Sequence, residues 1–278
     1  MGKETFHGTE KVQRDYYGRR RLASHFPPIV DYLSPTAHVL DVGCGPGTIT
    51  LEVAAELTSG TLIGVDSEES SIDKARALAS DLGVGNVSFQ VGDAYQLPFD
   101  TDTFDLTYSR VLIDWLREPV KALQEQKRVT KPGGRVVASL GDWASRIRYP
   151  ACPAVEKLIA AMDHFSDPAG ELFVGIHHGR QAFAFFSDAR FEQIEMRGQV
   201  YPANVVYAGS EHFDTPHPWR DAGAFAASPF SEQLLANGSI DRATLERADS
   251  ENAAWRDHPH AFEMSAQVLA VGTVPRAA

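Results

Sequence analysis

The sequence contains few cysteines and no long apolar run. Cys44 and Cys152 are the two cysteines among 278 residues, which is too few for a disulfide framework. Asp, Arg or Gly interrupts every candidate apolar stretch before about 18 residues, so no segment is expected to span a bilayer. Residues 1–10 lack the apolar run of a secretory signal. These absences predict a reduced, cytoplasmic location and no membrane partner.

Positive charge is also scarce. Lys and Arg number 26 against 37 Asp and Glu, which gives a formal net charge of −11 at pH 7. A protein that neutralises nucleic-acid phosphates needs the opposite balance, so a small-molecule substrate and no nucleic-acid partner are expected. The apolar fraction of 43% is enough for a buried core, and no repeat or long linker divides the chain. Residues 1–278 are therefore predicted to form a single domain, and a homodimer is left open.

Short β-branched runs alternate with helical stretches from His38 onward. The alternation predicts helices at 48–57, 70–82 and 119–129, a turn at 131–134, and strands at 38–42, 61–65, 87–91, 104–109 and 135–140. Parallel strands need a crossover, and a helix between two strands supplies it. This order predicts an α/β fold with a doubly wound, mostly parallel, Rossmann-like sheet.

The two ends of the chain depart from this alternation. Residues 1–33 are expected to form an N-terminal helical cap over the 34–140 core. After residue 140 the apolar spacing predicts strands at 190–201 and 266–274 and helices at 153–165, 181–186, 231–236 and 241–255, with Ser239 or Asp241 capping the last. Residues 141–190 are thus expected to supply substrate-side helices, and residues 202–262 a helical insert that covers a pocket.

A glycine-rich turn separates the first predicted strand from its helix. Gly43, Gly45 and Gly47 allow backbone N–H groups to approach a ligand closely at a helix N-terminus. Asp66 follows at the end of the next strand, where an acid can accept hydrogen bonds from both hydroxyls of a ribose. A nicotinamide or flavin site and an S-adenosylmethionine site both fit this pair of features. Thr48 stands where the dinucleotide motif needs a small residue, and the charge of Asp41 would repel a pyrophosphate but suit a cationic ligand.

Five ordered motifs resemble one family. They are Val39–Gly47 (VLDVGCGPG), Gly64–Asp66, Gly92–Ala94, Phe104–Leu106 and Arg128–Gly134. Their order and spacing resemble class I S-adenosylmethionine-dependent methyltransferases, and most closely the small-molecule branch that includes the ubiquinone and menaquinone biosynthesis methyltransferases. The resemblance covers residues 38–140 well and the flanks weakly.

The resemblance implies a set of cofactor-binding residues. Asp41 and Gly43 would meet the methionine portion, Asp66 the ribose hydroxyls, and Asp93 the adenine amino group. The full implied set is Tyr17 (or Tyr16), Asp41, Gly43, Gly45, Asp66, Ser67, Asp93, Ala94 and Ser109.

The acceptor side is less defined. Trp143 and Tyr149 are expected to line a substrate pocket because they follow the predicted fifth strand, where ligands sit in open α/β sheets. His178 and His212 are the candidates for a general base. The run Arg19–Arg21 either binds an acidic substrate group or forms a solvated helix face. His177 and His178 are adjacent and cannot bind one ion from one helical face, so no metal is predicted.

These observations predict transfer of a methyl group from S-adenosylmethionine to a small molecule. The methylated atom is oxygen, nitrogen or carbon, and a secondary metabolite or quinone-like compound is the expected acceptor type. Two alternatives stay open: a cofactor-binding protein of the same fold that does not methylate, and an NAD-dependent oxidoreductase.

Overall fold

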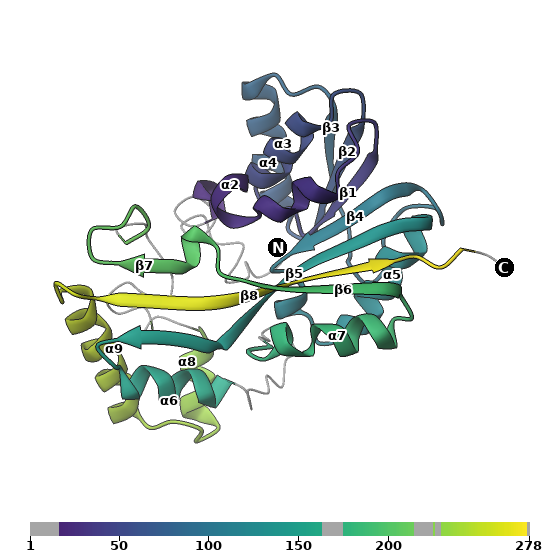
Figure 1. The fold of residues 1–278 in the computed structure, drawn as a ribbon. Coiled ribbons are helices and arrows are strands. Elements are labelled where there is room, and N and C mark those ends of the chain that lie inside the picture. Colours follow the sequence, from purple (N-terminus) through teal and green to yellow (C-terminus); the bar gives the residue numbers. More distant parts are fainter. Residues whose placement is uncertain (1–16, 163–174, 214–224, 226–228, 277–278) are drawn as a thin grey trace.

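An eight-stranded sheet organises the computed structural model, which describes residues 17–162, 175–213, 225 and 229–276. The strand order is β3-β2-β1-β4-β5-β8-β6, with β7 paired to β8 (Figure 1). Strands β1 to β5 are mutually parallel, and β8 runs antiparallel to β5, β6 and β7. The predicted α/β fold with a mostly parallel sheet is confirmed.

The helices and strands follow the predicted alternation in the first half of the chain. The strands are β1 (His38–Val42), β2 (Thr61–Asp66), β3 (Val87–Val91), β4 (Phe104–Arg110), β5 (Thr130–Tyr149), β6 (Glu192–Gln199), β7 (Val205–Tyr207) and β8 (Phe262–Thr273). The α-helices are α2 (Leu22–His25), α3 (Thr48–Glu56), α4 (Glu69–Leu82), α5 (Pro119–Val129), α6 (Pro153–Met162), α7 (His178–Asp188), α8 (Pro229–Ala236) and α9 (Arg242–Arg256). Short 3₁₀ turns are η1 (Tyr17–Arg19), η2 (Pro27–Tyr32), η3 (Ile113–Trp115) and η4 (Pro202–Asn204).

Strand β5 is much longer than predicted. The sequence indicated a turn at 131–134 and a strand that ends at residue 140, yet β5 runs without interruption to Tyr149. Its second half pairs with β8, which supplies backbone partners beyond the end of the parallel sheet. Residues 141–149 are therefore strand and not the start of the expected substrate-side helices. Among the described residues of 141–190, the helices are α6 and α7.

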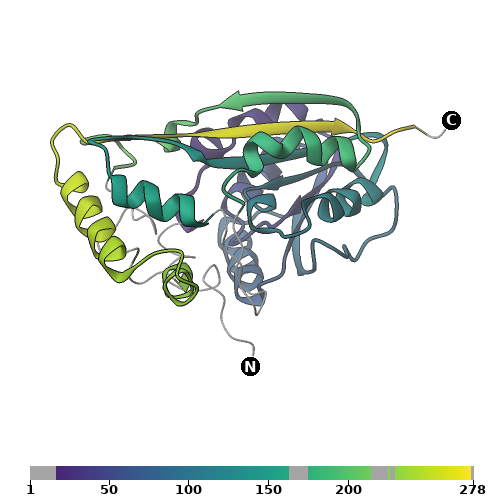
Figure 2. The same cartoon turned by 90° about the horizontal axis from the view of Figure 1, so that it is seen from below.

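A second hydrophobic core lies against the extended strands. Helices α6 and α9 lie under the same face of the β5–β8 extension (Figure 2). Their shared core includes Leu158, Phe230 and the fully buried Trp255. Asp241 caps α9 as predicted, because its carboxylate accepts a hydrogen bond from the Thr244 N–H at 2.6 Å. Within the described chain, no helix has the length and apolarity needed to cross a membrane.

Candidate functional site

The glycine-rich turn joins β1 to α3 at the carboxyl edge of the parallel strands. Gly43, Gly45 and Gly47 have φ angles of 80°, 55° and 78°, a region that L-residues with a Cβ rarely adopt. A Cβ on Gly47 would lie 2.9 Å from Ala75 Cβ, whereas a Cβ on Gly45 would meet nothing within 4 Å. Gly47 is therefore needed for packing, and the absent side chain of Gly45 leaves the backbone open toward the edge of the sheet.

Asp66 ties the end of β2 to this turn. Its Oδ2 accepts a hydrogen bond from Gly45 N–H at 2.9 Å, and its Oδ1 accepts one from Glu68 N–H at 3.0 Å. Burial raises the pKa of this carboxyl above its ordinary value. Each carboxylate oxygen has a second lone pair, so Asp66 can still accept hydrogen bonds from a bound hydroxyl.

The other predicted cofactor residues lie at the same edge. Asp93 follows β3 and is exposed, and its Oδ1 accepts a hydrogen bond from Tyr95 N–H at 2.8 Å. Ala94 is half-buried beside it, and Ser67 is exposed directly after Asp66. Tyr17 opens the η1 turn. The position of its side chain, like all of Tyr16, falls outside the described structure.

Asp41 is a buried member of a polar network. Thr50 Oγ1 and Tyr108 OH both donate to Asp41 Oδ2, at 2.7 and 2.8 Å. Burial outweighs these bonds and raises the Asp41 pKa to about 7. Both bonds go to Oδ2, so Oδ1 of this buried carboxyl takes part in neither of them.

The end of β4 carries two unusual features. Ser109 is buried, and its hydroxyl has no hydrogen-bond partner among the described residues. Val111 has a φ of 53°, which is a strained conformation for a β-branched residue, and its N–H donates to Ser139 O at 2.7 Å. Strained backbone of this kind clusters at ligand sites, so the turn after β4 is a candidate part of the site.

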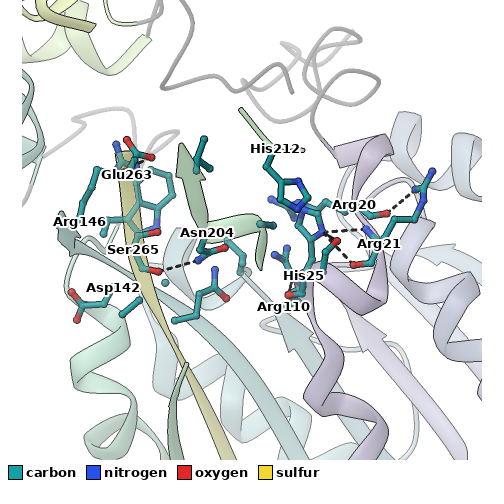
Figure 3. Close-up of a pocket in the computed structure, with 18 of the residues that line it drawn as sticks. Arg20, Arg21, His25, Arg110, Asp142, Arg146, Asn204, His212, Glu263 and Ser265 are labelled. Atoms are coloured by element: carbon teal, nitrogen blue, oxygen red, sulfur yellow. Dashed lines mark hydrogen bonds and ion pairs between the residues drawn. The ribbon is translucent and has the colours of Figure 1, made fainter. Parts of the chain in front are cut away.

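A polar cavity of about 230 Å³ opens at the carboxyl end of β4 and beside the middle of β5. Five arginines line it, and we refer to it as the arginine cavity: Arg19, Arg20, Arg21, Arg110 and Arg146. Arg20, Arg21 and Arg110 lie on one wall, and Arg146 lies on the opposite wall beside Glu263 (Figure 3).

The arginine cavity and the glycine turn are neighbours. A Cβ on Gly43 would lie 3.1 Å from Leu112, which follows the cavity residue Val111. A ligand cradled by the turn would therefore lie next to the cavity. Trp143 and Arg146 also line an adjoining cavity of about 310 Å³, with Val155, Ile159 and Ile176 among its apolar walls.

Two of the predicted acceptor-side residues line the arginine cavity. Trp143 lines this cavity, although it lies within β5 and does not follow it. His212 also lines the cavity, and its ring centroid lies 5.9 Å from that of His25.

The other two predicted residues lie elsewhere. Tyr149 lines neither described cavity, because alternation along β5 turns Arg148 inward and leaves the Tyr149 side chain 59% exposed. His178 is buried at the start of α7, where its Nδ1 lies 3.0 Å from Ile113 O. The His178 ring packs against Phe185, and the residue lines neither cavity.

Sequence reasoning missed His25 and Arg110 as cavity residues. Arg110 Nε donates to His25 O at 3.0 Å, which fixes α2 against the end of β4. Burial, together with the charges of Arg110 and Arg20, lowers the His25 pKa to about 2. His25 therefore stays neutral at neutral pH. The run Arg19–Arg21 was the one sequence feature that indicated arginines on this wall of the cavity.

Residues 33–170 match a family model described as "Methyltransferase domain". The chain carries a methyltransferase domain. This match confirms the resemblance to class I methyltransferases on which the motif analysis rested. The match includes strands β1 to β5 and helix α6, and therefore the glycine turn and, of the cavity arginines, Arg110 and Arg146.

Curated relatives share this methyltransferase domain. An uncharacterized methyltransferase of Schizosaccharomyces pombe is 41% identical over 128 residues, which cover 44% of this chain and 46% of the relative. A demethylmenaquinone methyltransferase of Symbiobacterium thermophilum is 37% identical over 112 residues, 38% of this chain and 43% of the relative. The matched part thus spans about half the length of these relatives.

The fold is also that of solved methyltransferases. A phosphoethanolamine N-methyltransferase of Haemonchus contortus aligns with a TM-score of 0.59 at 13% identity, covering 98% of this chain and 59% of the other. At this identity the likeness shows a shared fold.

Proposed function

We propose that the protein binds S-adenosylmethionine at the glycine turn and catalyses methyl transfer to a small molecule in the arginine cavity. The observation that carries the proposal is the pairing of Asp66 with Gly45. A carboxylate at the end of β2 lies against a backbone position whose missing side chain leaves open space. This arrangement suits a ribose whose two hydroxyls donate to one carboxylate.

The remaining edge residues fit the two ends of the same cofactor. Asp93 Oδ2, which takes no part in the bond to Tyr95, would accept from the adenine amino group, with Ala94 and Ser67 beside it. Asp41 Oδ1 and the buried Ser109 hydroxyl would meet the methionine portion near the end of β4. Charge-assisted bonds of this kind favour the ionised form of Asp41.

The chain's own contribution to the reaction is positioning and exclusion of water. The bound cofactor supplies an electrophilic methyl group on a sulfonium. Val111 and Trp143 would hold the acceptor within roughly 3–3.5 Å of that group, beside the glycine turn. His212 is the predicted general base that lines the cavity, and methyl transfer to a good nucleophile does not demand one.

Other parts of the proposal rest on composition. Cys44 and Cys152 are both free, which fits a reducing cytoplasm. The net charge of −11 favours a small acceptor over nucleic acid. A homodimer remains a prediction.

Transfer of a labelled methyl group tests the proposed activity. The protein is incubated with S-adenosylmethionine carrying a labelled methyl group and a panel of phenols, amines, thiols and quinone precursors. We expect S-adenosylhomocysteine to form together with a product heavier by one methyl group. Cofactor binding without transfer to any acceptor would favour the alternative of a non-methylating cofactor-binding protein.

The raised pKa of Asp41 predicts a pH-dependent affinity for S-adenosylhomocysteine. The carboxyl group is half-protonated at about pH 7, and the protonated form cannot attract the ligand's ammonium group. Affinity should therefore rise about 10-fold or more between about pH 5.5 and pH 7.5, as the carboxylate forms. Calorimetric titration at several pH values measures this rise.

Asp41→Asn is the matched variant, because it keeps an acceptor oxygen for Thr50 and Tyr108. We expect weaker binding with a flat pH profile over this range. Asp73→Asn, at an exposed position on α4, should keep the profile of the parent protein. An unchanged pH profile in Asp41→Asn would assign the pH dependence to another group.

A further inference from the structure

The second cavity, which adjoins the arginine cavity, is bounded by helix α6, and we refer to it as the α6 cavity. Helix α6 lies under the extension of β5 (Figure 2), and the cavity between them has a volume of about 310 Å³. Six of its described lining residues are apolar: Trp143, Ala144, Val155, Ile159, Ala160 and Ile176. Mostly apolar walls with a few polar groups are typical of sites that bind small molecules.

The remaining described lining residues carry no excess of either charge. They are Arg146, Arg148, Cys152, Glu156 and His177. Arg148 Nε donates to Glu263 Oε2 at 2.9 Å, and Arg146 Nε lies 3.9 Å from Glu263 Oε1. With Glu156 and Glu263 counted, two carboxylates accompany the two guanidinium groups. The α6 cavity therefore offers an uncharged ligand apolar contacts without requiring it to neutralise a charge.

Trp143 stands between the two cavities as a fixed aromatic surface, because it lines both of them. Its indole N–H hydrogen-bonds to the carboxylate of the buried Asp114. Its ring meets the ring of Trp115 edge-on, with the centroids 5.7 Å apart. An aromatic side chain that is already held in place loses little conformational entropy when a ligand packs against it.

The volume of the α6 cavity limits the size of what can bind there. An apolar cavity of about 150 Å³ is large enough to bind benzene. The α6 cavity has about twice that volume. It therefore has room for two fused rings or for a branched alkyl group of similar size.

We infer that the methyl acceptor carries an uncharged hydrocarbon portion, of the size of one or two rings, that binds in the α6 cavity against Trp143. The methylated end of the same molecule then lies in the arginine cavity, which shares Trp143 and Arg146 with the α6 cavity. The inference rests on the proposed function where it calls the bound molecule an acceptor. Because burial removes apolar surface from water, affinity should grow with the size of the ring system until the cavity is full.

Binding of uncharged probes to the protein loaded with S-adenosylhomocysteine tests the inference without turnover. The probes are phenol and 2-naphthol, which share a hydroxyl group and differ by one fused ring, and calorimetry measures their binding at low and high salt. We expect 2-naphthol to bind about 10-fold more tightly than phenol or better, with an affinity that changes little with salt. Equal affinities for the two probes would contradict the inference.

Two substitutions that narrow the α6 cavity from different walls locate the bound ring. Ala144 on β5 and Ala160 on α6 both line the cavity and are exposed, so a larger side chain there can fill it without displacing the core. Ala144→Phe and Ala160→Phe should each lower the affinity for 2-naphthol by about 10-fold and leave the affinity for S-adenosylhomocysteine unchanged. Ala254→Phe, at an exposed position on α9 that lines neither cavity, should change neither affinity.

The two cavity variants decide the outcome. Loss of 2-naphthol affinity in either of them places the ring in the α6 cavity, whereas parent-like affinity in both would overturn the inference. Titration with S-adenosylhomocysteine is read separately, and the probes are also titrated into the protein alone. Binding of 2-naphthol in the α6 cavity without any binding of S-adenosylhomocysteine would count against the proposed function and leave the cavity as a binding site for hydrocarbon.

Discussion

Asp66→Ala is expected to lower the affinity for S-adenosylhomocysteine by about 100-fold or more. The variant removes the acceptor proposed for two ribose hydroxyls, and hydrogen bonds to a charged group contribute about 1.5–3 kcal/mol each. The variant also removes the hydrogen bond that Gly45 N–H donates to Asp66 Oδ2 at 2.9 Å. The glycine turn then loses a bond that fixes its conformation. Two such losses give about 3 kcal/mol or more, and about 1.4 kcal/mol corresponds to a tenfold change in affinity.

Two further variants interpret this result. Asp66→Asn keeps one acceptor oxygen and should lose less affinity than Asp66→Ala. Asp73→Ala removes an exposed carboxylate of α4 and should bind as the parent protein does. Parent-like affinity in Asp66→Ala would show that the ribose does not bind at the end of β2. Circular dichroism of each variant shows whether it is folded, so that a loss of affinity caused by a lost contact is distinguished from one caused by unfolding.

Glu263→Gln is expected to cost about 3–5 kcal/mol in the free energy of unfolding. Glu263 is the carboxylate between Arg146 and Arg148, and the three side chains are 8%, 11% and 2% exposed. Arg148 also donates to Asn252 Oδ1 at 3.0 Å and lies 4.5 Å from the centre of the Trp255 ring. Neutralising the acid removes the carboxylate that pairs with two buried guanidinium groups, and breaking a buried pair in this way costs more than the pair itself contributes.

Urea unfolding measures the effect, and a double variant identifies its cause. Glu263→Leu with Arg148→Met removes both charges and should retain more stability than Glu263→Gln. Glu195→Gln alters an exposed pair with Arg197 and should change stability little. If Glu263→Gln unfolded at the urea concentration of the parent protein, the buried ion cluster would not hold the extended strands together.

The parallel core was predictable because each of its elements is encoded locally. Strands such as His38–Val42 and Val87–Val91 match their predicted bounds, since β-branched runs and glycine turns mark them directly in sequence. The place of the proposed cofactor residues at the strand ends was predictable for the same reason. Asp66 and Gly45 each belong to a short motif with a fixed position at a strand end.

The extension of β5 was not predictable from local pattern. Arg148 is buried and Ile147 is 54% exposed, which inverts the expected order of apolar and charged faces. The burial of Arg148 is accounted for by Glu263, which lies 115 residues later on β8 and pairs with it. The Tyr149 side chain lies outside both described cavities for this reason, because the strand continues and its alternation turns that side chain outward.

The arginine cavity was hidden for a related reason. Its arginines come from the N-terminal turns, the end of β4 and the middle of β5, and no window of sequence contains all three sources. His25 likewise gives no motif, and its place beside Arg110 depends on how α2 packs against the sheet. Sites assembled from distant segments by tertiary packing leave little trace in any one of them.

Calorimetric titration of the whole chain with S-adenosylmethionine, S-adenosylhomocysteine and NAD, run in parallel, tests the central claim most directly. The glycine turn, Asp66 and the buried acid Asp41 together predict micromolar binding of the first two ligands at one site and no heat with NAD. No heat of binding with either S-adenosylmethionine or S-adenosylhomocysteine, or binding of NAD in their place, would contradict the assignment of the glycine turn as the S-adenosylmethionine site.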